Sequence, residues 1–579
     1  MVLVLSKDKL LLYYLRLVKL GIKQEILIAL HDVAETMFTS TRHCRTLLKE
    51  MESIGWLEWT PKAGRNQRST LHLRYKPEEL KIALANQMIS HGKYEKALVL
   101  VDNDQALFGQ LLQKSSGTRR REGRLHIQLT YHRQFSELLP HKPLRNSERF
   151  LLRQVYACLT QCDENGNVTP QLAHHWQYDE NTYQWRFYIR PQLSFHDGSE
   201  ISADEIVKLF SSLKQLPRYK KELSHVKGIT AINPYCIAFQ LDQPDPGFAG
   251  LIADVKYSIQ PTSQLQSANV TIGSGAFQVQ EHSESRLQLQ AFDNYFACRA
   301  IVETVTIWQV PLQEADSFGK TELKADACVS DQPSCSHYLS VHNDNDIIGS
   351  HQYTRIEDGC LLMLFNHRSQ LLRAQRKYVS QILNPSQLVN FQIEAIPARN
   401  LVPSWMNTLT SPISKQALPP TLAIGLFEHP ALIGCANSMA EKLKRFGIEC
   451  NINIYSFEAF HAMASENSLA EDLILTSLNL DDNRPTSAFR WLLSNEVLHQ
   501  SLTTENSDWL INELVTVRQN HPVTEYMQGL EPIATSMINE HWLLPLYHHR
   551  QTLHFEGVLK GVSITAWGWP SFLDVWSED

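Results

Sequence analysis

Arginine and lysine side chains recur at helical spacing near the start of the chain. Arg42, Arg45 and Lys49 stand at positions i, i+3 and i+7 within residues 39–56, so a helix there would align them in one basic stripe. Such a stripe can contact base edges and phosphates in a DNA major groove. A solvated helix face has the same pattern, so the stripe alone does not decide between the two. The hydroxyl side chains expected beside it are those of Ser40, Thr41 and Thr46.

The same segment has an apolar face that can be buried. Its four members recur at the spacing of one side of a helix that Thr39 or Ser40 can begin: Cys44, Leu47, Leu48 and Met51. Residues 30–38 have the pattern of a shorter helix, with Val33, Ala34, Met37 and Phe38 apolar. Two helices separated by a residue or two predict a helix-turn-helix whose second helix carries the basic stripe.

A basic hairpin is expected directly after this helix. Residues 57–75 have the pattern of strand, turn and strand, and Pro61, Gly64 and Asn66 supply the turn. Charge at its tip would make the hairpin a wing for the neighbouring DNA backbone, which favours DNA binding over a solvated helix face. The contacts expected from this hairpin are those of Lys62, Arg65, Asn66 and Arg68.

The net charge of −7 over 579 residues is unevenly distributed. Residues 1–76 contain thirteen Lys and Arg against seven Asp and Glu, which gives +6 and leaves −13 for the remainder. A basic head on an acidic body is typical of a DNA-binding domain joined to a sensor. The length is too great for one core and predicts roughly three or four domain-sized units.

Neither export nor a membrane span is predicted. The apolar start is interrupted by Lys7, Asp8, Lys9 and Arg16 without a cleavage site, and no run of about eighteen uncharged apolar residues occurs. The ten cysteines are scattered, and we expect them to be reduced thiols, several of them in the core. A cytoplasmic protein without a membrane partner is therefore expected.

The chain divides into three predicted parts. Residues 6–20 should add a first helix to the winged module, and residues 77–113 have the pattern of two or three connector helices outside it. Residues 114–124 are charged and are expected to form a flexible linker, a more common role for such a run than phosphate binding. The expected domains are a winged helix-turn-helix over 1–76, a connector and basic linker over 77–123, and a sensor over 124–579.

The sensor region has an α/β pattern. An alternating strand is expected at 124–133, a helix at 148–159, and another helix behind Ser202 with acidic residues in its first turn. Residues 272–292 have the pattern of a Gly-rich turn and hairpin, and residues 360–383 that of a strand followed by a helix. A strand, helix and strand over 422–455 predict a βαβ unit, and residues 541–555 a strand that returns to the first part of the region.

Sequence signals for catalysis or metal binding are weak. The chain has no Gly-x-Ser-x-Gly elbow, His-Glu-x-x-His motif or Walker loop. The pairs His174–His175 and His548–His549, and Cys158 with Cys162, do not have zinc-finger spacing, so core or surface roles are expected. We expect no enzyme, metal or cofactor, although a hydrolase whose residues converge only in three dimensions stays open.

Residues 154–179, with Pro170, Leu172, Ala173 and Trp176, resemble the opening segment of the extracellular solute-binding proteins of oligopeptide, dipeptide and nickel transporters (family 5). Residues 185–210 resemble the run of that family that contains Phe-His-Asp-Gly, and residues 272–279 its Gly-rich turn. Ala276 stands where proline is usual. A winged head on this body, without a signal peptide, is similar to the bacterial SgrR-type transcriptional regulators, most closely over 39–69 and 145–161.

The resemblance implies a multidomain α+β and α/β architecture. A winged helix-turn-helix and a helical connector precede a two-lobed body of the type II periplasmic-binding-protein class, with solute held between the lobes. The first lobe is expected over 124–305 plus 540–579, and the second over 306–539. In SgrR-type regulators the implied signal is accumulation of sugar phosphate, and the implied response is gene activation.

Ligand-contact candidates also follow from the resemblance. Phe365 and Asn366 resemble the cleft-facing Phe-Asn strand of the family. Asn479 and Asp481 lie near its Trp-x-x-Asp-Tyr-x-Asp-Pro position, but the tryptophan and tyrosine are missing, which speaks against a peptide pocket. Two aromatic residues complete the candidates. Trp405 could stack on the face of a sugar, and Tyr156 is another candidate for the pocket.

The expected function is a ligand-responsive transcriptional regulator. Its partners would be promoter DNA and a small solute (a sugar phosphate, sugar or short peptide), with RNA polymerase as the further partner of an activator. The solute would close the body, and the connector would relay that closure to the head. Two alternatives are a receptor that delivers peptides or sugars to an ABC-type transporter and an enzyme with a regulatory head.

Overall fold

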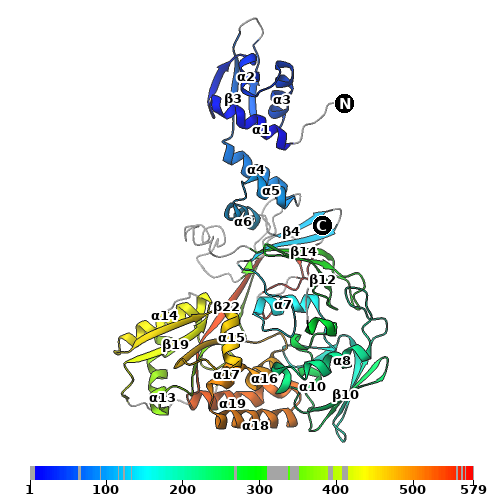
Figure 1. Cartoon of the computed structure of the whole chain (residues 1–579), viewed down its shortest axis with the longest axis vertical. Helices are drawn as coiled ribbons and strands as arrows, with labels where there is room; N and C mark the ends of the chain where they lie inside the picture. Colours follow the sequence, from blue (N-terminus) through cyan, green and yellow to red (C-terminus); the bar gives the residue numbers. More distant parts are fainter. Residues whose placement is uncertain are drawn as a thin grey trace. The chain divides into compact units, whose positions relative to one another are not determined.

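The chain forms two compact units, Met1–Ser115 and Ser116–Asp579 (Figure 1). The computed structural model describes residues 7–62, 67–90, 93–114, 117–121, 124–131, 133–266, 270–309, 337–338, 351–388, 395–406, 415–555, 559–561, 565–567 and 569–577.

The first unit opens with the predicted winged helix-turn-helix. Helices α1 (Lys7–Leu17), α2 (Leu30–Thr36) and α3 (Thr41–Ser53) accompany an antiparallel sheet of order β1-β3-β2. Strands β2 (Leu57–Thr60) and β3 (Ser69–Leu73) are the expected hairpin. Strand β1 (Glu25–Ile28) is an addition, because four residues with one buried position are too short for a recognisable alternation.

The apolar face of α3 lies at the centre of the core of this module. Its four predicted members, Cys44, Leu47, Leu48 and Met51, are all fully buried. Leu80 and Leu84 of α4 (Pro77–Ser90) belong to the same core. The prediction that the connector helices lie outside the winged module is therefore wrong for α4, which buries its leucines against that module. Helices α5 (Tyr94–Leu100) and α6 (Gln105–Lys114) follow, as the pattern predicts.

The turn between α2 and α3 is longer than expected. Residues 37–40 separate the two helices, where a residue or two is predicted. The Thr39 amide donates to the Ala34 carbonyl at 2.9 Å and the Phe38 amide to the Glu35 carbonyl at 2.9 Å, which closes α2 with Phe38 in the left-handed region (φ 54°). Phe38 is 78% exposed and so leaves the apolar face that Val33, Ala34 and Met37 bury.

Two sheets form the first lobe of the second unit, one of order β12-β13-β14-β5-β4 and one of order β10-β11-β9-β8. The strands of the first sheet are β12 (Phe277–His282), β13 (Arg286–Ala291), β14 (Val302–Gln309), β5 (Arg124–Tyr131) and β4 (Gly117–Arg121). Those of the second are β10 (Val226–Asn233), β11 (Cys236–Leu241), β9 (Gln184–Ile189) and β8 (Ala173–Asp179). Helix α7 (Asn146–Val155) packs on the first sheet and α8 (Ala203–Leu213), capped by Ser202 as predicted, on the second.

Residues 117–121 form a strand and not a linker. Strand β4 pairs antiparallel with β5, with Gly117 opposite Gln128 and Arg121 opposite Arg124. This pairing covers the edge of β5 that β14 leaves open, so the backbone of a charged run finds hydrogen-bond partners. The prediction of a flexible linker over 114–124 is wrong for these five residues.

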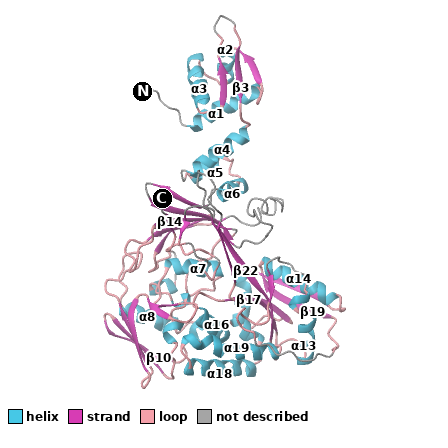
Figure 2. Cartoon of the chain, turned by 180° about the vertical axis from the view of Figure 1, so that it is seen from behind, coloured by secondary structure: helices cyan, strands magenta, loops and turns pink. Residues whose placement is uncertain are grey.

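The second lobe is built on one sheet of order β15-β22-β17-β21-β19-β20, with β16 and β18 also paired to β22. Its strands are β15 (His337–Tyr338), β16 (His351–Ile356), β17 (Gly359–Phe365), β18 (Ala395–Pro397), β19 (Thr421–Phe427), β20 (Glu449–Tyr455), β21 (Leu473–Asn479) and β22 (Leu543–Phe555). Strands β19 and β20 are parallel and flank α14 (Pro430–Lys444), which confirms the predicted βαβ unit. Figure 2 shows three helices between the first-lobe strands and this sheet: α16 (Arg484–Ser494), α18 (Thr504–Asn520) and α19 (Tyr526–Asn539).

Residues 540–579 are divided between the two lobes. Strand β22 pairs with β17, and its Leu543 and Leu546 are buried in the second-lobe core, so the prediction that this strand returns to the first lobe is wrong. Only the last segment reaches the first lobe. Trp567 and Trp569 lie in the first-lobe core, where the Trp569 ring stacks on Phe150 with 5.3 Å between centroids.

The helices of the described residues include none that is long and apolar enough to cross a bilayer. The cysteines in these residues are free thiols, as predicted, and Cys298 is the exposed one among them. Cys328 and Cys335 lie outside the described residues.

Candidate DNA-binding surface and interlobe site

The basic stripe of α3 faces solvent. Ser40 caps the helix by accepting a hydrogen bond from the His43 amide at 3.3 Å, which fixes where the stripe begins. Arg42, Arg45 and Lys49 are exposed, as are the neighbouring hydroxyls of Thr41 and Thr46. The structure thus brings the predicted stripe residues together on one helix surface.

These three cations differ from others in the same unit. Within the part of the chain that the structure describes, the stripe side chains make no ion pair. Lys23, Arg74 and Lys81, in contrast, are each paired with an acidic side chain of the unit. Unpaired cations on an exposed helix keep their charge available to an external anion such as a DNA phosphate.

The hairpin adds two more basic side chains. Lys62 and Arg68, on either side of the turn, are exposed, and the Lys62 amide donates to Ser69 Oγ at 3.2 Å. Arg65 and Asn66 lie outside the described residues. The arrangement matches a wing, and its contact with DNA stays a prediction.

Four of the predicted ligand residues are packed within their own lobes. Tyr156 is buried in the first lobe, and its hydroxyl donates to the Leu138 carbonyl at 2.9 Å. The buried amide of Asn366 donates to two second-lobe carbonyls at 3.1 and 2.9 Å. Phe365 and Trp405 belong to the second-lobe core. These contacts hold the lobes together internally, and a ligand role for the four residues stays a prediction.

Asn479 and Asp481 lie instead where the lobes meet. Arg149 of α7 donates to the Asn479 carbonyl and to Asp481 Oδ2, both at 3.2 Å. Arg153, one turn further along α7, lies 3.5 Å from the same Oδ2. The Asp481 carboxylate is fully buried and the arginine side chains are 13% and 17% exposed, so water screens these charges little.

In a second interlobe pair the acidic residue belongs to the first lobe and the arginine to the second. Asp254 of the first lobe lies 2.8 Å from Arg490 of α16. Burial favours the neutral acid, but Arg490 and the two α7 arginines outweigh it and hold the pKa of Asp254 at about 2. One turn along α16, Ser494 donates to Glu222 of the first lobe, whose carboxylate Lys256 binds at 2.7 Å.

The two lobes also approach each other closely at two glycines of the first lobe. A Cβ atom on Gly250 would lie 2.7 Å from Val523 Cγ2, and one on Gly166 would lie 2.8 Å from the Thr524 nitrogen. Gly166 also has a φ of 90°, which other residues rarely adopt. Larger residues at these positions would hold the lobes apart and separate the buried charges.

Two further carboxyl groups at this interface have raised pKa values. Burial, with Asp358 nearby, raises the pKa of Glu357 to about 8. Burial and the adjacent Asp481 raise the pKa of Asp482 to about 6, and its carboxylate accepts a hydrogen bond from the Ala566 amide at 2.8 Å. Burial thus favours the neutral acid at Glu357 and Asp482, whereas the arginines around Asp254 favour its carboxylate.

Arginines recur at a regular spacing at the start of α7 and along it. Arg145, Arg149 and Arg153 recur every four residues, the spacing of one helix face. The Arg145 guanidinium also reaches the second lobe, 3.5 Å from Glu428. Their acidic partners lie 283 to 332 positions further along the chain, so no local pattern connects the two sets.

The interlobe site holds guanidinium and carboxylate groups, which are the groups that pair with charged solutes. A ligand anion can replace Asp481 at the α7 arginines, and a ligand cation can replace the arginines at Asp481. In the described residues, one group has the spacing of metal ligands, His31, Asp32 and Glu35, all exposed on the seven-residue α2.

Two family models match the chain. The N-terminal model for sugar transport-related sRNA regulators matches residues 9–123, and the middle model of bacterial extracellular solute-binding proteins, family 5, matches residues 167–428. The fold is similar to the oligopeptide-binding protein AppA of Bacillus subtilis, with a TM-score of 0.61, 16% identity, and coverage of 78% of this chain and 98% of that one. It is also similar to AgaA of A. tumefaciens, solved with agropinic acid, with a TM-score of 0.62, 13% identity, and coverage of 78% and 99%. These features define a class of protein in which a winged helix-turn-helix head precedes a family 5 solute-binding body.

Relatives that match along nearly the whole chain identify the family within this class. The HTH-type transcriptional regulator SgrR of Photorhabdus laumondii is 30% identical over 564 residues, which cover 94% of each chain. The regulator of the same name from Escherichia coli O157:H7 is 28% identical over 562 residues, again 94% of each. The chain belongs to the SgrR family of HTH-type transcriptional regulators.

Replacing Asp481 by Asn should destabilise the body strongly. The substitution leaves Arg149 and Arg153 buried without their anion, a change that costs about 3–5 kcal/mol in comparable buried pairs. Urea unfolding followed by tryptophan fluorescence measures the loss. Asp482→Asn is the matched control, because it keeps the acceptor for the Ala566 amide and removes a repelling charge; equal losses from both variants would contradict the assignment.

Replacing Glu357 by Gln should make the body less sensitive to alkaline pH. The pKa of Glu357 is about 8 in the folded protein and 4.5 when unperturbed, so the folded state binds the extra proton between these values and loses stability as pH rises through them. Thermal unfolding midpoints from about pH 5 to pH 8 should fall less in the variant, by the equivalent of a few kcal/mol at most. The exposed Glu441→Gln should retain the wild-type pH dependence, and a Glu357→Gln profile parallel to wild type would refute the assignment.

Proposed function

We propose that the chain is a cytoplasmic regulator that binds promoter DNA through α3 and the hairpin and senses a small solute between its lobes. The observation that carries the DNA assignment is the exposed stripe of unpaired cations on the second helix of a winged helix-turn-helix. The free cysteines agree with a reducing compartment. Activation, with RNA polymerase as a further partner, rests on the resemblance to SgrR-type regulators alone.

We further propose a sugar phosphate as the solute. The family model for the head is that of sugar transport-related regulators, and a phosphate dianion suits the guanidinium groups of Arg149 and Arg153. The phosphate would take the place of Asp481 between them. Ligand binding would then replace the ion pairs of Asp481 by ion pairs of the phosphate. A ligand shifts a conformational equilibrium only if it contacts the two conformations differently, and this replacement would supply such a difference.

A transporter receptor is the alternative. The family 5 fold alone fits that role equally well, because fold does not determine function. The winged head with its exposed basic helix favours the regulator, since a receptor that passes solute to a transporter has no use for it.

Arg45→Ala should weaken DNA binding. Arg45 lies at the centre of the stripe, and losing one contact to a base or phosphate should lower affinity by about 5- to 150-fold, or 1–3 kcal/mol. The measurement is a mobility shift on a duplex selected by the wild-type protein from random fragments, at one fixed salt concentration. Lys19→Ala removes an exposed cation outside α3 and the hairpin and should bind as wild type does; indistinguishable affinities for the two variants would exclude the stripe.

Hexose phosphates should raise the thermal unfolding midpoint of the full-length protein. A ligand that binds only the folded state stabilises it by about 2.7 kcal/mol at one hundred times its Kd. The parent hexoses and short peptides should act less, and Arg149→Met should reduce the response to the phosphates. If the unfolding midpoint rises with peptides and not with phosphates, the proposal of a sugar phosphate as the solute is wrong.

A further inference from the structure

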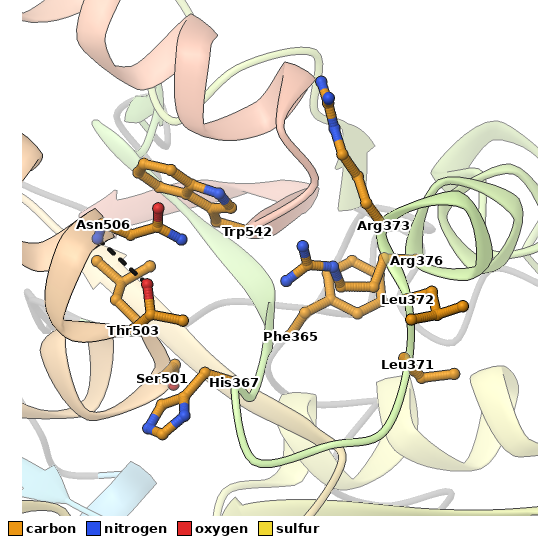
Figure 3. A pocket seen from close by; sticks show the side chains of 11 residues that line it. Phe365, His367, Leu371, Leu372, Arg373, Arg376, Ser501, Thr503, Asn506 and Trp542 are labelled. Carbon is orange, nitrogen blue, oxygen red and sulfur yellow. Dashed lines mark hydrogen bonds between the residues drawn. The ribbon is translucent and has the colours of Figure 1, made fainter.

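The second lobe contains a cavity of about 280 Å³. It lies between the start of α13 (Arg373–Ile382), the junction of α17 (Glu496–Ser501) with α18, and the residue before β22 (Figure 3). Its apolar wall is formed by Phe365, Leu371 and Trp542. The volume is just below the ~300–1,000 Å³ of pockets for drug-sized ligands, so it suits a small metabolite and not an extended peptide.

One arginine side chain is aimed into this cavity. Figure 3 shows the Arg376 guanidinium reaching from α13 toward Thr503 and Asn506 at the start of α18, whereas Arg373 turns away. Arg373 is held by Glu540 at 2.6 Å. Among the described residues the Arg376 guanidinium has no hydrogen-bond or ion-pair partner, and its Nε atom is buried. A half-buried cation without an anion has lost part of its hydration, and a bound anion would offset that cost.

The charge around the cavity is positive. The described residues that line it include Arg373 and Arg376 but no carboxylate. Burial and the cations Lys377, Arg373 and Arg376 together lower the pKa of the adjacent His541 to about 4. Arg373 and Arg376 against the carboxylate of Glu540 leave the charge here positive, which favours an anion such as a phosphate monoester.

The cavity is separate from the interlobe site. Phe365 ends β17, whereas Gly359 begins it next to the interlobe residues Glu357 and Asp358. Six steps of about 3.3 Å along a strand place roughly 20 Å between the two ends. A ligand in the cavity would therefore not touch Asp481.

Helix α18 nevertheless links the two places. Asn506 in its first turn lines the cavity. Near its other end, Arg518 lies 3.3 Å from His225 Nδ1, and Gln519 donates to Gln243 of the first lobe at 2.8 Å. A ligand that fixes the start of this helix also bears on the contacts that its end makes with the first lobe.

We propose that this cavity is a second ligand site, distinct from the interlobe site, that binds a small organic phosphate. The phosphate oxygens accept hydrogen bonds from the Arg376 guanidinium, and the carbon skeleton packs against Phe365, Leu371 and Trp542. Thr503 and Asn506 supply polar groups on the opposite side. Occupation joins α13 to the start of α18 and stiffens the second lobe. This site does not depend on the proposed regulator function.

Calorimetric titration of the full-length protein with phenyl phosphate tests the site. Wild type should bind the probe, and Arg376→Met should lower its affinity by about tenfold or more, as expected when a hydrogen-bonded charge is removed. Arg445→Met is the matched control, because Arg445 is an exposed arginine of the same lobe, paired with Glu441 outside the cavity. Its affinity for the probe should equal that of wild type.

A second variant separates loss of the site from loss of the fold. Asn506→Asp places a carboxylate opposite Arg376 in the first turn of α18, where a negative charge is favourable. Its unfolding temperature should equal or exceed that of wild type, and it should lose the same probe-binding component that Arg376→Met weakens. The proposal is overturned by wild-type affinity in Arg376→Met, by no binding at millimolar probe, or by a loss on Arg149→Met that leaves Arg376→Met unaffected.

Discussion

The two lobes are joined by charge that has been removed from water. Asp481 with the α7 arginines, and Asp254 with Arg490, are pairs in which each partner comes from a different lobe. Desolvating such groups is unfavourable, and the attraction offsets that cost only when the geometry is good. A small displacement of one lobe would leave ions buried without partners. The interface therefore favours either full contact or solvated separation over intermediate positions, which is the behaviour that a two-state sensor needs.

The cations of this chain have two distinct environments. In the first unit the α3 arginines and lysine project into solvent without partners, and in the second unit the arginines of α7 and α16 are buried against carboxylates. The first arrangement gives long-range attraction to a polyanion with little geometric demand. The second arrangement, the buried ion pairs, accepts only partners of matching geometry and produces little electric field outside the protein. Arginine thus lies exposed and unpaired on α3 in the head, and is buried in ion pairs between the lobes of the body.

Local patterns predict the elements better than the site. The apolar spacing around Leu47 fixes α3 and its buried face, because helix periodicity is a property of neighbouring residues. The same reasoning fails for strand β4, whose charged residues become extended only because β5 offers a free edge. Aromatic residue type predicts Tyr156 and Trp405 as ligand contacts, and both side chains pack in cores. The partners of Arg149 and Arg153 lie hundreds of positions away, so their pairing is a tertiary property that no local spacing encodes.

The last described segment gives the first lobe an unusual order of assembly. Its core combines Leu125 and Phe150 with Trp567 and Phe572, and Trp567 lies 442 positions after Leu125. During translation the winged module, complete by residue 115, can fold long before those aromatic residues leave the ribosome. The first lobe must wait with an unfilled apolar core while the second lobe is synthesised. A nascent chain therefore carries a finished head on an unfinished body, whose first-lobe apolar surface stays uncovered until the C-terminal aromatic residues emerge.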